Sequence, residues 1–162
     1  MNNVSGTPLE FHKFTTQKEA EEDFVYASYL RAATHQDYAA QDAGKRHPEL
    51  TRSLLRQKSM APCVVVTGSK GKGSVANMIS RILQTNFCIG LMTSPHITDF
   101  RERFRVNDTM INETDFCRLM AVIRPEILDI ASDLPESVCI SPMGIQADLA
   151  LTYFSEKHTD FN

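Results

Sequence analysis

The stretch Val64-Val-Val-Thr-Gly-Ser-Lys-Gly-Lys-Gly-Ser74 decides the fold class of this chain. Its three valines form a short β-branched apolar run, which is typical of a buried strand. Three glycines then punctuate a turn that carries two lysines. Beyond the turn, apolar residues recur at the i, i+3, i+4 and i+7 spacing of one helix face, at Val75, Met78, Ile79 and Ile82. The stretch therefore predicts a strand, a glycine-rich turn and a helix in direct succession.

This succession indicates a phosphate-binding loop. Glycines let backbone N–H groups turn inward, the helix dipole favours negative charge at its N-terminus, and a lysine adds a full positive charge. The strict pattern G-x-x-x-x-G-K-[ST] is not met, because Val66 stands at the first glycine position and Gly73 at the Ser/Thr position. If only the sequence of the loop is considered, the alternative interpretation is a glycine turn that binds no ligand.

A second short strand is expected from Cys88 to Thr93, after the helix. A strand, a helix and a strand in this order predict parallel pairing of the two strands with a right-handed crossover. A polar loop with three arginines and a glutamate then runs from residue 94 to residue 108. Ligand sites in open α/β sheets gather at the carboxyl ends of strands, so this loop suits an anionic substrate. The same composition is also common in ordinary exposed loops.

Two motifs in this region carry a family resemblance. The segment from Thr67 to Ser74 resembles the nucleotide loop of the Mur ligase superfamily, in the form T/A-G-T-N-G-K-G-S of folylpolyglutamate synthases and dihydrofolate synthases. Ser69 replaces the threonine of that motif and Lys70 its asparagine, while the matching residues are Gly68, Gly71, Lys72, Gly73 and Ser74. The family's second block, G-L-Y-T-S-P-H-L…E-R-[IF]-x-[VI], is matched at Gly90, Leu91, Thr93, Ser94, Pro95, His96, Glu102 and Arg103.

The resemblance implies a site for ATP and Mg²⁺. Lys72 is the candidate catalytic residue, because it would hold the β- and γ-phosphates, and Ser94 is the implied magnesium ligand. The implied nucleotide-binding residues are Gly68, Ser69, Lys70, Gly71, Lys72, Gly73 and Ser74. The implied substrate-binding residues, in the loop beside the folate site, are Pro95, His96, Arg101, Glu102 and Arg103.

The resemblance also implies a reaction, ATP-dependent amide formation. A substrate carboxylate, folate-like or other, attacks the γ-phosphate to give an acyl phosphate, and an amine, commonly that of glutamate, displaces phosphate. This chemistry needs charge neutralisation and positioning more than proton transfer. The alternatives are a nucleotide-binding remnant without catalysis, a different Mur-type ligase, and a P-loop kinase or NTPase.

The expected fold is α/β, a partial Mur-ligase-like central domain with a mainly parallel sheet flanked by helices. Residues 1–44 are expected to form a lead-in and a packing helix, and residues 45–162 a partial ATP-binding domain. The family's later metal ligands and its second domain have no counterpart here, so the chain is interpreted as an N-terminal fragment or truncated frame, inactive alone. Residues 158–162 are expected to approach another core strand.

The remaining expectations concern local elements. Residues 44–58 predict a helix, and Asn107-Asp108 predict a hairpin turn. Asn112 is expected to cap a helix that Pro125 kinks or ends. The segment from Ser141 to Phe154 resembles a family helix, although glycine stands at position 144 where glutamate is usual.

Composition narrows the classes of protein. A net charge of −3 over 162 residues argues against nucleic-acid binding. No apolar run reaches the roughly 20 residues of a membrane helix, and residues 1–10 show no secretory signal. The four cysteines, Cys63, Cys88, Cys117 and Cys139, form no C-x-x-C pair, which predicts reduced, buried thiols in a cytoplasmic protein.

Overall fold

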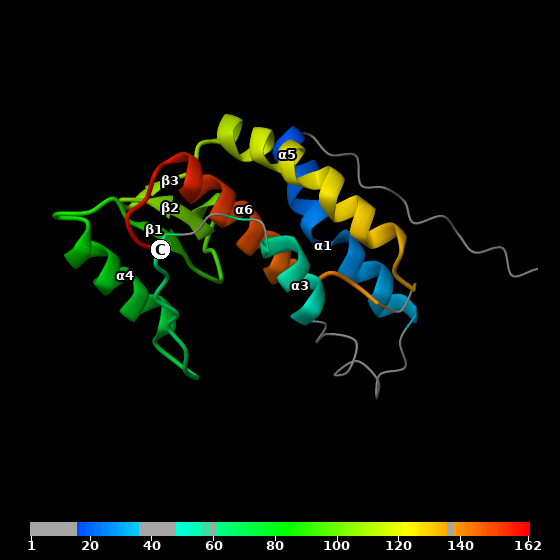
Figure 1. Cartoon of the computed structure of the whole chain (residues 1–162), viewed down its shortest axis with the longest axis horizontal. Helices are drawn as coiled ribbons and strands as arrows, with labels where there is room; N and C mark the ends of the chain where they lie inside the picture. The colour runs from blue at the N-terminus through cyan, green and yellow to red at the C-terminus, as the bar shows by residue number, and fades with distance from the viewer. Residues whose placement is uncertain (1–15, 36–47, 57, 59–60, 136–137) are drawn as a thin grey trace, which may run out of the picture.

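A computed structural model describes residues 16–35, 48–56, 58, 61–135 and 138–162 (Figure 1). The predicted boundary at residues 44 and 45 lies outside these residues, as does the beginning of the helix predicted from residue 44. The elements, in chain order, are α1 (Gln17–His35), α3 (Pro48–Leu55), α4 (Lys72–Leu83), β1 (Gly90–Met92), the 3-10 helix η2 (Phe100–Arg103), β2 (Phe104–Val106), β3 (Thr109–Met110), α5 (Glu113–Ser132) and α6 (Pro142–Glu156).

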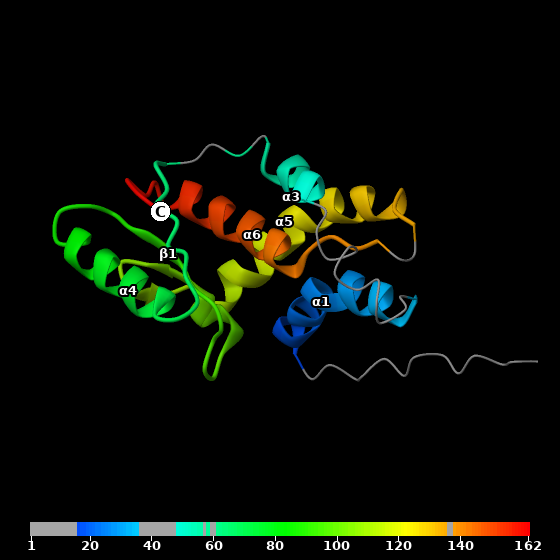
Figure 2. The same cartoon turned by 90° about the horizontal axis from the view of Figure 1, so that it is seen from below.

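Four helices form the larger part of the structure. α6 packs against α1, α3 and α5, and α1 also packs against α5 (Figures 1 and 2). The core that they share with β2 is apolar, and its largest fully buried side chains include Phe104, Phe116, Leu119, Met120, Ile123, Ile145 and Leu149. Each such side chain stabilises the fold by about 1.5–3 kcal/mol relative to exposure.

α5 begins as the sequence predicts and continues beyond Pro125. The Asn112 side chain accepts a hydrogen bond from the Asp115 backbone N–H at 2.8 Å, which confirms the N-cap. Pro125 lies inside the helix, which continues to Ser132, so of the two predicted alternatives an end at Pro125 is wrong and a kink there stays a prediction. The buried residues of α5 on either side of this proline, from Phe116 to Ile127, hold the helix against the core.

The described strands form an antiparallel sheet in the order β1-β2-β3. Gly90 pairs with Val106 and Met92 with Phe104. The predicted hairpin turn is confirmed, because Asn107 and Asp108 have φ values of 46° and 62°, as a type I′ turn requires. The prediction of a mainly parallel sheet is not met in this part of the chain, because the hairpin β2–β3 occupies one edge of β1.

The predicted direct pairing of the segments around residues 64–66 and 88–93 is wrong. Residues 64–66 are not assigned to a strand, and the end of the chain lies between the two segments. Residues 158–162 were expected to approach a core strand, and Phe161 does form a single parallel bridge with Ile89. The Asn162 N–H donates to the Pro62 carbonyl at 3.0 Å, and the Val64 N–H donates to the Asn162 carbonyl at 2.8 Å.

α4 flanks β1 at the end of the molecule opposite the helical cluster (Figure 2). The predicted helix is confirmed, but only part of its apolar face is covered. Ile79 is half-buried, whereas Val75, Met78 and Ile82 are exposed. Few described elements pack against α4, which explains why its apolar face remains open.

None of the four cysteines forms a disulfide. Cys117 and Cys139 are buried as predicted, but Cys63 is exposed and Cys88 is half-buried, so burial holds for two of the four. Among the described helices, none has the length and apolar character that crossing a membrane requires.

Candidate functional site

The glycine loop ends at the N-terminus of α4. Gly71 caps this helix with a φ of 75°, and Gly68 has a φ of 142°, so both positions need the conformational freedom of glycine. Lys72, Gly73 and Ser74 form the first helical turn, and their backbone N–H groups have no hydrogen-bond partner in the part of the chain that the structure describes. The loop therefore presents a group of free amides at a positive helix end.

The two lysines of the loop are placed differently. Lys72 donates from Nζ to the Gly68 carbonyl at 2.7 Å, so its side chain folds back over the loop. Lys70 and Ser69 are exposed at the tip of the turn. A phosphate group bound at the amides would compete with the Gly68 carbonyl for the Lys72 ammonium group.

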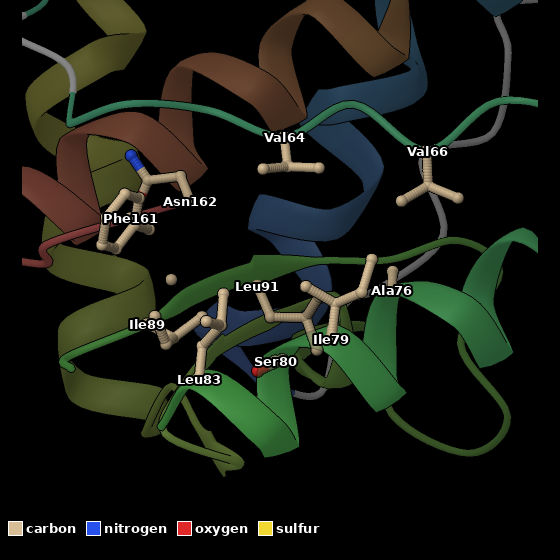
Figure 3. A pocket seen from close by; sticks show the side chains of 11 residues that line it. Val64, Val66, Ala76, Ile79, Ser80, Leu83, Ile89, Leu91, Phe161 and Asn162 are labelled. Atoms are coloured by element: carbon tan, nitrogen blue, oxygen red, sulfur yellow. The ribbon is translucent and has the colours of Figure 1, made fainter. Parts of the chain in front are cut away.

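Lys72 and Ser94 line the same cavity, which has a volume of about 380 Å³. Gly73 lies at the same wall, at the start of α4, and Ser94 follows β1. α6 contributes apolar lining through Met143, Ala147, Leu151 and Phe154. A smaller cavity of about 40 Å³ adjoins it between residues 64–66, α4 and β1 (Figure 3). The structure therefore brings the two sequence motifs together at one opening.

Glu102 holds the loop that follows Ser94. Its carboxylate accepts hydrogen bonds from the backbone N–H groups of Ile97, Thr98 and Asp99 at 2.9, 3.1 and 3.0 Å, and from the Thr98 hydroxyl. The Thr98 hydroxyl and these backbone donors lower the pKa of Glu102 to about 2. The carboxylate is thus engaged within its own loop.

Arg103 is the buried centre of the second motif. Its Nε donates to His96 Nδ1 at 3.0 Å, and one terminal nitrogen donates to Ser94 Oγ at 3.3 Å and to Gln146 Oε1 at 2.7 Å. The guanidinium also lies 5.0 Å from the centre of the Phe100 ring. Arg103 therefore orients Ser94 and His96 together, while α6 supplies the anchor through Gln146.

Arg101 is occupied by a neighbouring carboxylate. It contacts both oxygens of Asp99, at 3.1 Å from Nε and 2.9 Å from a terminal nitrogen. Lys18 of α1 donates to the same carboxylate at 3.2 Å. The Arg101 hydrogen bonds, together with that of Lys18, hold the pKa of Asp99 well below its usual range despite partial burial. Pro95 is exposed beside this network.

The donor set around Ser94 does not by itself fit Mg²⁺. Magnesium prefers an octahedron of oxygen ligands that includes carboxylates or phosphates. The Ser94 hydroxyl instead accepts a hydrogen bond from a guanidinium, and no group of three or more His, Cys, Asp or Glu side chains suited to a metal occurs among the described residues. The amides beside Lys72, in contrast, do fit a phosphate group.

Two side chains of this region were not singled out from the sequence. Gln146 is buried on α6 and holds Arg103, and Asp99 neutralises Arg101. A glutamine among the apolar residues of a buried helix face is a signal that could have pointed to Gln146, because a buried amide needs a polar partner. Asp99 lies three residues before Glu102, the spacing of the capping box that they form at η2.

Sequence comparison relates the chain to known enzymes. It is 37% identical over 79 residues to the folylpolyglutamate synthase of Candida albicans. It is 33% identical over 94 residues to the dihydrofolate synthase/folylpolyglutamate synthase of Bacillus subtilis. The matches cover 48% and 57% of this chain. No protein-family model matches.

Structural comparison agrees with the sequence. The folylpolyglutamate synthase of Thermotoga maritima superposes with a TM-score of 0.66 at 29% identity, over 86% of this chain. The chain is a relative of the folylpolyglutamate synthases and dihydrofolate synthases. It corresponds to only part of these enzymes, because it spans 15% and 21% of the two curated relatives and 32% of the Thermotoga maritima chain. The Mycobacterium tuberculosis folylpolyglutamate synthase, crystallised with ADP, superposes with a TM-score of 0.64 at 25% identity, over 85% of this chain and 31% of its own.

Proposed function

We propose that this chain is the ATP-binding portion of an ATP-dependent amide-bond-forming ligase of the folylpolyglutamate synthase type. The observation that carries the proposal is that Lys72, at the start of α4, and Ser94, after β1, line one cavity. The relationship to folylpolyglutamate synthases supports it, and one solved relative was crystallised with ADP. The same proposal puts the protein in the cytoplasm, where thiols such as those of its four cysteines stay reduced.

The chain's own groups would act on the phosphates. The free amides of residues 72–74 would surround the phosphate oxygens, and Lys72 would exchange the Gly68 carbonyl for one of them. Gly68, Ser69, Lys70 and Gly71 would shape the loop, with the Lys70 ammonium group adding a second positive charge. This arrangement would stabilise the charge that develops when a carboxylate attacks the γ-phosphate.

Magnesium would reach this site with the nucleotide. The phosphates would provide most of its ligands, and Ser94 is the side chain proposed to meet it. Bound Mg²⁺ would supply charge neutralisation. Arg103 already donates to the Ser94 hydroxyl, and the second lone pair of that oxygen would be the one to meet the metal.

The loop after Ser94 is the proposed substrate side of the site. Pro95 and His96 would face a folate-like or other carboxylate substrate, and Arg101 would bind it by exchanging the Asp99 carboxylate for that of the substrate. Glutamate would be the amine that completes the amide. Glu102 and Arg103 would position the loop, because their polar atoms are engaged within it and with α6.

A second candidate function is a nucleotide-binding remnant without catalysis. One observation favours it, the lack of any carboxylate cluster for a metal in the part of the chain that the structure describes. Another Mur-type ligase would use the same loop with a different carboxylate. A P-loop kinase or NTPase is less well supported, because the relatives found are folylpolyglutamate and dihydrofolate synthases.

Calorimetry with Mg-ATP tests the binding step. We expect weak binding, and Lys72→Ala should reduce the affinity by roughly 10- to 100-fold, since a charge-assisted hydrogen bond contributes about 1.5–3 kcal/mol. Arg81→Ala is the matched control, because it removes an exposed cation from the other end of α4. Equal losses in the two variants would indicate unspecific charge attraction and contradict the proposed loop.

A turnover assay separates the ligase from the remnant. The 162-residue chain should not hydrolyse ATP in response to folate and glutamate. Robust hydrolysis that depends on both substrates would contradict the prediction that this portion is inactive alone. Binding of Mg-ATP without such hydrolysis would fit both the ligase portion and the remnant, and covalent extension to the length of a relative would then distinguish them.

A further inference from the structure

Each oxygen of the Asp99 carboxylate has two hydrogen-bond donors. Oδ1 accepts from the Arg101 backbone N–H at 2.9 Å and from Arg101 Nε at 3.1 Å. Oδ2 accepts from a terminal nitrogen of Arg101 at 2.9 Å and from Lys18 Nζ at 3.2 Å. The Arg101 guanidinium therefore supplies one donor at each oxygen, and a different group supplies the other.

The guanidinium can leave Asp99 without leaving either carboxylate oxygen unpaired. The Arg101 backbone N–H stays at Oδ1, because this hydrogen bond is the cap of η2, and Lys18 stays at Oδ2. A polar atom that loses its last partner in a half-buried position is what makes such a release costly. Asp99 avoids this cost, since one donor remains at each of its oxygens.

Lys18 is placed to keep its contact with Asp99. It lies at the start of α1, which packs against α5 and α6. One turn later in the same helix, Glu22 Oε1 lies 3.7 Å from Lys18 Nζ. The side chains of Lys18, Asp99 and Arg101 are 22%, 21% and 16% exposed, so solvent reaches all three. A dissolved ligand can therefore compete with Asp99 for the guanidinium.

The cap of η2 does not explain the negative charge of Asp99. A helix cap needs one side-chain oxygen, which asparagine supplies as well as aspartate. Among the residues that the structure describes, the partners of the second oxygen, Oδ2, are the cationic side chains of Arg101 and Lys18. The carboxylate thus holds two cations in addition to capping η2.

We propose that Asp99 and Lys18 determine which ligands Arg101 accepts. Asp99 occupies the guanidinium until a carboxylate of the ligand replaces it, and Lys18 then keeps the released Asp99 paired. The two donors that Arg101 frees match the two oxygens of a planar carboxylate. Neutral ligands do not displace Asp99, so the arrangement selects a substrate that bears a carboxylate. This inference rests on the proposed function, in which Arg101 binds the substrate carboxylate.

Ligand binding by two single variants tests the proposal. The probe is N-benzoylglutamate, its diamide is the matched neutral ligand, and NMR titration of the 162-residue chain measures the affinity. Asp99→Asn keeps an oxygen for the cap and releases Arg101, so the affinity should rise by about three- to tenfold. A purely structural role of Asp99 predicts no gain. Lys18→Met should lower the affinity about threefold, because Asp99 then retains Arg101.

The double variant separates release of Arg101 from simple charge attraction. If Lys18 acts by pairing with Asp99, Lys18→Met should change the affinity less than about twofold once Asp99→Asn is present. A direct attraction between Lys18 and the ligand would persist in the double variant. Lys157→Met is the control, because it removes a lysine that lies 3.5 Å from a different carboxylate, that of Asp115, and should leave the affinity unchanged. Circular dichroism confirms that each variant remains folded.

Arg101→Met in the Asp99→Asn background tests the proposed function separately. Loss of carboxylate binding there would support Arg101 as a substrate-binding residue, and an unchanged affinity would contradict that part of the proposed function. Binding that depends on Arg101 but gains nothing from Asp99→Asn would overturn the role of Asp99 and Lys18 alone. Equal binding of the diamide, or an undiminished effect of Lys18→Met in the double variant, would overturn it too. Absence of binding in every variant would contradict both.

Discussion

Arg103 and Gln146 form a buried hydrogen bond of 2.7 Å between the loop after β1 and helix α6. Both side chains are at least nine-tenths buried, and no carboxylate contacts the guanidinium among the described residues. The positive charge is instead shared among Gln146, His96, Ser94 and the face of Phe100. The guanidinium is thus held by neutral acceptors and an aromatic face, and its role is to position the loop against α6.

Replacing Gln146 with leucine tests this anchor. The change leaves a buried N–H of Arg103 unpaired, so the free energy of unfolding should fall by about 1–3 kcal/mol. Urea denaturation measures the loss. The double variant Gln146→Leu with Arg103→Met removes the unpaired donor as well, so its destabilisation should be smaller than the sum of the two single changes. Additive losses would show that the two residues do not interact.

Lys58 and Asp148 make a second buried link, between α6 and the segment that follows α3. Lys58 Nζ lies 2.8 Å from Asp148 Oδ1, and Asp148 is fully buried. Burial raises the pKa of the Asp148 carboxyl, although Lys58 opposes the shift. Lys58→Met should destabilise the fold by about 3 kcal/mol at pH 7, because it leaves a buried carboxylate without its cation.

The destabilisation caused by Lys58→Met should become smaller as the pH falls. A carboxyl with a raised pKa in the folded state costs stability when ionised, so acidification through the range just above its usual pKa of 3.8 relieves the cost. Lys58→Met should therefore recover part of its loss as the pH falls from neutral toward the usual pKa of 3.8, as measured by urea unfolding at several pH values. The double variant Lys58→Met with Asp148→Leu lacks this carboxyl, so its stability should show no such recovery on acidification.

Glu102 should respond to acid in the opposite direction. Its pKa is lowered to about 2 by the Thr98 hydroxyl and by backbone N–H donors, so the ionised form supports the loop. This contribution is present above the usual pKa of 4.5 and is lost as the pH falls toward 2. Glu102→Gln should remove that part of the acid sensitivity, and NMR titration of the Ile97 and Asp99 amides should lose its transition. If the NMR transition of these amides were unchanged in Glu102→Gln, it would report the titration of another carboxyl, such as that of Asp99.

Local signals in the sequence predicted local structure well. The helix after the glycine loop, the Asn107-Asp108 turn and the Asn112 cap are each specified within a few residues, and each is present. The sheet was predicted less well, because pairing depends on segments distant in sequence. The Cys88–Thr93 segment does form a strand, but its neighbours are Phe104–Val106 and Phe161, which no periodicity around residue 90 reveals.

In the candidate site, too, the sequence predicted local motifs but not the contacts between distant segments. The two motifs identified Lys72 and Ser94, and the structure places both at one cavity. They gave no indication that Glu102 and Arg103 would be engaged internally, since those hydrogen bonds depend on loop geometry and on α6. Gln146 is separated from Arg103 by 43 residues, so only the packing of α6 brings them together.

Gly144 departs from the related helix motif, and the packing of α6 on α3 gives a physical reason. A Cβ atom at this position would lie 2.6 Å from Thr51 Oγ1 and 3.3 Å from its Cγ2. Gly144→Ala would normally stabilise a helix by up to about 1 kcal/mol, but here we expect a net loss of about 1–3 kcal/mol from overpacking. Thermal unfolding measures the sign. Combining Gly144→Ala with Thr51→Ala removes the clash, so the double variant should be more stable than Gly144→Ala alone. A stabilising single change would show that α3 can move away from α6 at little cost.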